Sequence, residues 1–153
     1  NTMLQPTVMV QMADVRWTTA AVEVAARRAK EIGAEIALVE MIACERLNWQ
    51  GIEAHDYQFS SSERENIKAY KAIAARYGVP VSVHVCRYES LTEAIAQAAD
   101  ELDAESVFVT LPHTLIPFVH ERQVLQLNHL LEEHYHHLFT VNTRVHEPEI
   151  AAV

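Results

Sequence analysis

Histidines are numerous in this chain and are the first residues that could do chemistry. Nine histidines occur in 153 residues, and four of them crowd into the segment HLLEEHYHH. Two of these are three positions apart and would share one face of a helix, with Glu133 beside them. Imidazole and carboxylate groups of this kind bind zinc or nickel. The four histidines are His129, His134, His136 and His137.

A solvated helix end explains the same segment, and we favour it over a metal site. No His-Glu-x-x-His spacing occurs, and Cys44 and Cys86 lie elsewhere in the sequence. Histidine near the end of a helix also interacts favourably with the negative end of the helix dipole. We therefore predict no metal site and keep metal binding by these histidines as the alternative.

The segment VFVTLPHTLIPFVHERQ, residues 107–123, is the second candidate for chemistry. It resembles the end of a buried strand, a turn and the start of a helix, a junction where α/β proteins bind phosphate. Glycines usually provide the room there, and this segment has none. Pro112 and Pro117 also lack the N–H group that a phosphate would need. The pattern indicates a junction that does not hold phosphate.

Catalytic patterns are missing from the sequence. There is no Gly-x-Ser-x-Gly segment and no cysteine with a histidine at a motif position. Carboxylates near the ends of predicted elements are weak evidence for acid–base chemistry. We therefore predict that the chain is not an enzyme. These carboxylates belong to Asp14, Glu40, Glu89 and Asp103.

Composition narrows the class of protein. The net charge of -9 disfavours nucleic acid as a partner, because an acidic surface repels phosphates. No run of about 18 apolar residues is present, and the amino end lacks the pattern of a secretion signal. Cys44 and Cys86 are too few for a disulfide scaffold, so we predict free thiols and a cytoplasmic location. Asn1 stands where an initiator Met would, which fits a processed chain or part of a longer one.

Hydrophobic periodicity predicts alternating strands and helices. Gly33 should end the first helix, and Ser62 with Glu65 and Ser90 with Glu93 should form capping boxes that begin the next two. The predicted strands are 7–12, 34–42, 81–87, 106–110 and 138–143, and the predicted helices are 17–32, 62–77, 90–102 and about 117–137.

This order predicts an α/β fold, a doubly wound five-stranded parallel sheet with helices on both faces, similar to a Rossmann fold. We expect one domain over 1–153, with a core from 7 to 143 and a loose tail over 144–153. Ligands of such folds lie beyond the carboxyl ends of the strands, where the connections diverge to opposite faces. The chain after the first strand should therefore face the chain after the fourth.

The organisation resembles the universal stress protein family over roughly residues 7–143. The segments that carry this likeness are AAVEVAARRAKEIGAEIALVEMI, KAIAARYGVPVSVHV and YESLTEAIAQAADELDAESVFV. The resemblance implies an adenine-nucleotide hydrolase-like fold. Proteins of this family are usually dimers. The resemblance also implies one of two groups, since some members of the family bind ATP and others do not.

The ATP-binding members share a glycine motif after the fourth strand: Gly, two residues, Gly, nine residues, Gly, then Ser or Thr. Here that spacing falls on Thr110, His113, Gln123 and Val124, and none matches. A β-branched side chain and a ring would occupy the room that glycine leaves for phosphate. The resemblance therefore implies a member that has lost the ATP site, with no cofactor.

The same comparison implies that the chain keeps part of the adenine side of the ATP site. The family has an Asp just after the first strand, where this chain has Ala13, with Asp14 one residue later. Met41 falls near an adenine-lining position, and Thr18 matches a Ser at the start of the first helix. The candidate ligand pocket that the resemblance implies consists of Ala13, Asp14, Met41, Thr110 and His113.

The resemblance finally implies a regulatory or interaction domain of the stress response, as a homodimer or as part of a larger protein such as a transporter. The resemblance implies that the last strand forms the dimer edge, because that strand often pairs across the dimer in the family. A bare edge strand would also invite aggregation. The alternative is a binder of a small adenosine-like or anionic ligand other than ATP in the remodelled pocket. An enzyme of the wider hydrolase-like group is disfavoured without phosphate-binding glycines. The dimer edge comprises Leu138, Phe139, Thr140, Val141 and Asn142.

Overall fold

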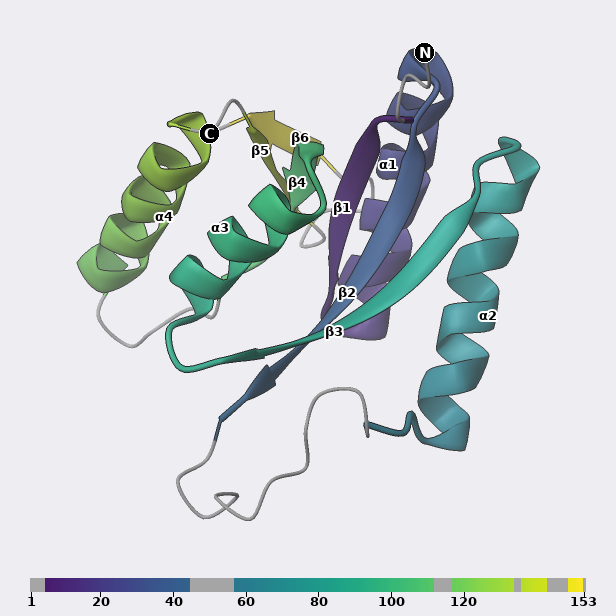
Figure 1. Ribbon diagram of the computed structural model, residues 1–153, viewed down its shortest axis with the longest axis horizontal. Coiled ribbons are helices and arrows are strands. Elements are labelled where there is room, and N and C mark those ends of the chain that lie inside the picture. The colour runs from purple at the N-terminus through teal and green to yellow at the C-terminus, as the bar shows by residue number, and fades with distance from the viewer. Residues whose placement is uncertain (1–4, 45–56, 112–116, 134–135, 143–148, 153) are drawn as a thin grey trace.

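The computed structural model describes residues 5–44, 57–111, 117–133, 136–142 and 149–152. Strands and helices alternate along most of the chain (Figure 1). The strands are β1 (Thr7–Met12), β2 (Glu35–Ala43), β3 (Val81–Tyr88), β4 (Ala104–Phe108), β5 (His137–Asn142) and β6 (Glu149–Ala152). The helices are α1 (Val15–Ile32), α2 (Ser61–Arg76), α3 (Leu91–Glu101) and α4 (Pro117–Glu132).

The sheet confirms the predicted doubly wound α/β fold. Its strand order is β3-β2-β1-β4-β5-β6, and the pairings among β1 to β5 are all parallel. The chain moves outward from β1 to β3 and then returns past β1 to β4. The point where the connections diverge therefore lies between the carboxyl ends of β1 and β4.

Two layers of helices cover the two faces of this sheet. Every residue of β1 is buried, and alternate side chains of the strand point to opposite faces. Val8 and Val10 pack in a cluster with α1 and α2, whereas Met9 packs with α3 and α4. Figure 1 shows α3 and α4 side by side, on the other side of β1 and β2 from α2. No helix in the described ranges is long and apolar enough to cross a membrane.

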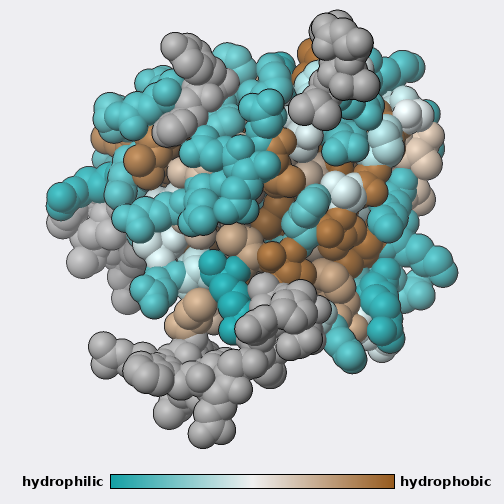
Figure 2. Space-filling view, in the orientation of Figure 1, coloured by the Kyte–Doolittle hydropathy of each residue, from teal (hydrophilic) through white to brown (hydrophobic). Residues whose placement is uncertain are grey.

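The edge strand β3 is less protected than β1. All eight of its residues are partly exposed, whereas four residues in the middle of β2 are buried. In the space-filling view, apolar residues appear near the centre of the molecule, between the polar surfaces of the flanking helices (Figure 2). The core is therefore densest around β1 and thins toward β3.

A sixth strand corrects the sequence-based boundary at the carboxyl end. β6 pairs antiparallel with β5, with Phe139 opposite Ala152 and Asn142 opposite Glu149. Residues 149–152 thus belong to the sheet, although the sequence predicted a loose tail over 144–153. The expectation that 138–142 forms an edge of the sheet is wrong for the same reason, because β5 lies between β4 and β6. Pairing with the chain's own tail satisfies the backbone groups that a bare edge would expose.

The helix ends agree only in part with the predicted caps. Gly33 has φ 69° and ends α1 as predicted. The first capping box lies two residues earlier than expected, since Ser60 and Glu63 form it and not Ser62 and Glu65. The second box is wrong, because the Ser90 side chain makes no capping hydrogen bond. α4 ends at Glu132, short of the predicted end near 137.

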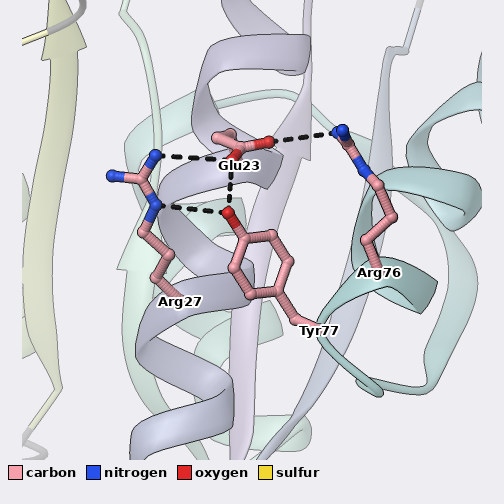
Figure 3. A network of polar contacts seen from close by, with 4 residues as sticks. All are labelled: Glu23, Arg27, Arg76 and Tyr77. Atoms are coloured by element: carbon pink, nitrogen blue, oxygen red, sulfur yellow. Dashed lines mark hydrogen bonds and ion pairs between the residues drawn. The ribbon is translucent and has the colours of Figure 1, made fainter.

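A polar network joins α1 to the end of α2 (Figure 3). The Glu23 carboxylate lies 3.4 Å from the Arg27 guanidinium and 3.4 Å from that of Arg76. The Tyr77 hydroxyl contacts Glu23 and accepts a hydrogen bond of 3.3 Å from Arg27 Nε. Both arginine side chains are exposed, so these ion pairs orient the two helices and add little to stability.

A buried histidine joins β5 to the rest of the sheet. The His136 side chain is only 4% exposed, and its Nε2 lies 2.7 Å from Asp100 Oδ1 on α3. Its Nδ1 contacts the backbone carbonyl of Ala104 at the start of β4. The histidine therefore fixes the start of β5 against two other elements.

Replacing His136 should destabilise the fold much more than replacing an exposed histidine. His136→Ala removes the contacts with Asp100 and the Ala104 carbonyl and empties a buried position, so we expect a loss of about 2–4 kcal/mol in the free energy of unfolding. His129→Ala is the control, because that side chain is 75% exposed. Urea denaturation of both variants measures the difference. Equal midpoints would contradict the role given to His136.

Removing β6 should increase self-association. A chain that ends at Asn142 leaves the outer edge of β5 without the strand that pairs with it. We expect larger species of this truncated chain than of the full chain in sedimentation velocity at equal concentration. Identical distributions of the two would show that β6 does not protect this edge.

Candidate functional site

A cavity of about 210 Å³ lies between the carboxyl ends of β1 and β2 and the amino-terminal half of α2. Most of its lining side chains are apolar or aromatic, but two are carboxylates. The lining residues are Met12, Ala13, Glu40, Phe59, Glu63, Asn66, Ile67 and Tyr70. The cavity therefore adjoins the predicted switch point but extends toward β2.

Strand alternation brings these side chains together. Met12 continues the face of β1 that carries Val8 and Val10, and Glu40 continues the face of β2 that carries Leu38. On α2, Tyr70 packs in the core, while Glu63 lies two turns earlier and reaches the cavity. The cavity thus forms where the shared core of the sheet and α2 ends.

Glu63 is held in place as an ionised carboxylate. Its Oε1 accepts a hydrogen bond of 2.8 Å from the backbone N–H of Ser60, and its Oε2 accepts one of 3.0 Å from the Tyr57 hydroxyl. The bond from the Ser60 backbone is the main reason why the pKa of Glu63 lies below its usual value. Glu63 is therefore charged at neutral pH and cannot rotate without breaking the cap of α2.

The pKa of Glu40 is shifted in the opposite direction to that of Glu63. Glu40 is partly buried and makes no hydrogen bond or ion pair with any residue in the described ranges. Burial, and then the negative charge of Glu63, raise the pKa of Glu40 from 4.5 to about 7. A carboxyl group with such a shifted pKa in a cavity marks a candidate functional site.

Hydrogen bonds fix the chain that follows β1. The backbone N–H of Ala13 donates to Thr18 Oγ1 over 2.9 Å, and Thr18 also hydrogen-bonds to the Tyr70 hydroxyl. Asp14 caps α1 by accepting the backbone N–H of Trp17 over 2.9 Å. This side of the cavity is therefore preorganised.

The chain after β4 is held by the side chain of Gln11, a residue that the sequence patterns did not indicate. The backbone N–H of Thr110 donates to Gln11 Oε1 over 2.9 Å, and Gln11 is 7% exposed. By the spacing that the family resemblance implies, Thr110 would stand at the first glycine of the ATP-binding motif. The donor at that position is consequently engaged within the protein.

The structure describes four of the five residues of the sequence-based pocket and separates them. Among these four, only Ala13 lines the cavity. Asp14 caps α1, and Met41 packs against the cluster on the opposite face of the sheet, near α3 and α4. Thr110 pairs with Gln11, and His113 lies outside the described residues.

The cavity residues that were missed left two signals in the sequence. Glu40 is the one charged residue inside the apolar run IALVEMI, and it was noted only as a carboxylate near a strand end. Ser60 and Glu63 have capping-box spacing, which predicts that Glu63 lies at the first turn of a helix.

The histidine cluster is divided among several elements. His129 on α4 pairs with Glu133 over 3.1 Å, His136 is buried, and His137 belongs to β5. His134 lies outside the described ranges, and within those ranges no three metal-binding side chains lie together. Cys44 and Cys86 are free thiols, and burial raises the pKa of Cys86.

Several solved structures of universal stress proteins have a similar fold. One, in complex with cAMP, has 14% identity and a TM-score of 0.64 over 90% of this chain and 97% of its own. One from Burkholderia pseudomallei has 16% identity and a TM-score of 0.55, over 82% and 92%. One from Archaeoglobus fulgidus, in complex with dAMP, has 18% identity and a TM-score of 0.52, over 82% and 92%.

These likenesses show that the chain has the universal stress protein fold. The sequence itself matches no family model and no curated protein.

Glu40→Gln should stabilise the protein in a pH-dependent way. The folded state holds a proton on Glu40 up to about pH 7, whereas the unfolded chain releases it near pH 4.5. The folded state binds more protons in that window, so Glu40 lowers stability as pH rises through it. We expect a gain of about 1–2 kcal/mol at pH 8, discounted for partial exposure, and little gain at pH 4.5.

Urea denaturation at both pH values measures this effect. Glu65→Gln is the matched control, because Glu65 is exposed on α2, which borders the cavity, and the change in charge is identical. An equal effect of the two substitutions at pH 8 would show that Glu40 is solvated like a surface carboxylate.

Proposed function

We propose that this chain is a universal stress protein-like regulatory or interaction domain that works without binding ATP. The observation that carries the proposal is the hydrogen bond from the Thr110 backbone N–H to Gln11. This bond occupies the backbone N–H of Thr110, which a phosphate would need as a donor. In the family motif that position is a glycine, and here a β-branched residue replaces it. In this proposal the domain is cytoplasmic and has no catalytic activity.

The proposal includes self-association or incorporation in a larger assembly, such as the regulatory part of a transporter. β6 is the outermost strand of the described sheet, so a homodimer would form elsewhere than at the edge of β5. The uneven burial of the sheet supports an interaction role, because all residues of β3 remain partly exposed.

A second candidate function is small-ligand binding in the cavity. The observation that favours it is Glu40, a partly buried carboxyl group in the cavity wall without a hydrogen-bond partner in the described chain. An anionic ligand is disfavoured, because Glu63 is ionised beside it. The cAMP and dAMP complexes of similar structures support an adenosine-like ligand as one possibility for this fold.

ATP should bind no more tightly than adenosine. If the phosphate site is lost, the triphosphate adds no favourable contacts and is repelled by a chain of net charge -9. Calorimetric titration of the full chain with each compound measures the ratio, and mass spectrometry of a denatured sample detects nucleotide carried through purification. Micromolar ATP binding, at least tenfold tighter than adenosine, would contradict the proposal.

A further inference from the structure

Among the described residues, none that lines the cavity beside α2 carries a positive charge. The eight lining residues include two carboxylates and no Lys, Arg or His. Glu63 already accepts two hydrogen bonds from the protein, but Glu40 accepts none from the described residues. Holding a second carboxylate beside Glu63 away from water costs free energy, and a positively charged ligand would relieve that cost.

The described groups that act on Glu40 include no counter-ion. Glu63 on α2 is the neighbouring charge that acts on it, and the hydroxyls of Tyr57 and Tyr70 lie close enough to feel the charge of Glu40. Both hydroxyls are engaged, since Tyr57 donates to Glu63 and Tyr70 hydrogen-bonds to Thr18. Within the described part of the chain, the charge of Glu40 is therefore left for a proton or a ligand to neutralise.

The remaining walls suit an organic cation and not a bare metal ion. Met12, Phe59, Ile67 and Tyr70 present apolar and aromatic surfaces, and an aromatic ring attracts a cation over its face. A metal ion would need more oxygen ligands, and the described chain has no cluster of three metal-binding side chains. The volume of about 210 Å³ equals roughly seven water molecules, which is enough for a small cyclic compound.

We propose that this cavity binds a small organic cation, an amidinium or ammonium group on a planar or apolar body, with Glu40 as its counter-ion. Glu63 supplies a second negative charge, and Asn66 offers an amide for orientation. This inference rests on the second candidate function and assigns its ligand class. It places the ligand between β2 and α2, away from the chain that follows β4.

The probe for this proposal is benzamidine, a planar amidinium, with neutral benzamide as its isostere. Titrations of the full chain are followed by shifts of backbone amide NMR signals, at pH 6 and pH 8. We expect benzamidine to shift residues of α2 and the end of β2 and to bind at least tenfold more tightly than benzamide. Cation binding needs ionised Glu40, so affinity should rise about tenfold from pH 6 to pH 8.

Two variants assign this effect to the cavity. Glu40→Gln should reduce benzamidine affinity at pH 8 by at least tenfold and remove the pH dependence that Glu40 causes. Glu65→Gln should leave both unchanged, although it alters the net charge equally and Glu65 lies on α2, which lines the cavity.

Three outcomes would overturn the proposal. Benzamidine could fail to bind, it could bind no better than benzamide, or Glu40→Gln could bind it as well as the unchanged chain. Adenine serves as a neutral comparison: if it alone binds, and more tightly at pH 6 than at pH 8, protonated Glu40 pairs with a neutral base instead. The ATP titration tests whether the chain after β4 binds phosphate, and its result does not bear on this cavity.

Discussion

Burial of β1 on both faces is the constraint on which the rest of the structure depends. Because the strand lies in the middle of the sheet, its alternating side chains must supply both halves of the core. The same alternation continues to its carboxyl end, where consecutive residues serve different purposes. Gln11 turns to the β4 side and engages the N–H of Thr110, whereas Met12 lines the cavity beside α2.

The electrostatics of the cavity follow from the start of α2. Glu63 completes the capping box and accepts the Tyr57 hydroxyl, so its position and its negative charge are fixed by the helix that it caps. Glu40 lies on β2 without such donors, and its protonation depends on burial and on that fixed charge. Two carboxyl groups in one cavity therefore have different protonation at neutral pH. The charge of the cavity therefore changes with pH as Glu40 gains or loses a proton. In our proposal a cationic ligand can neutralise Glu40 in place of that proton.

The parts of the fold that depend on local pattern could be predicted from the sequence. Buried runs such as TVMVQM and the apolar stripe of α1 indicated the strands, the helices and their order, and Gly33 indicated where α1 ends. The capping box of α2 was placed two residues late because three consecutive serines allow both Ser60–Glu63 and Ser62–Glu65. β6 is only four residues long, so its pairing with β5 depends on tertiary contact and leaves almost no pattern.

The site was harder to predict because it depends on which face each residue of a strand occupies. Met41 and Glu40 are neighbours in sequence, yet they point to opposite sides of the sheet, and only Glu40 reaches the cavity. The family resemblance placed Met41, and not Glu40, in the candidate pocket. The hydrogen bond of Gln11 joins residues 99 positions apart, which no local pattern could reveal.

The titration of the Glu40 side chain tests the central claim most directly. Carboxyl-carbon NMR of the protein, with the Glu40 signal assigned by the Glu40→Gln variant, follows its protonation between pH 3 and pH 9. The account predicts a midpoint near pH 7 for Glu40 and a pKa below the usual range for Glu63. A midpoint for Glu40 near the ordinary value of 4.5 would show that the cavity is fully hydrated. The case for a cationic ligand would then lose its basis.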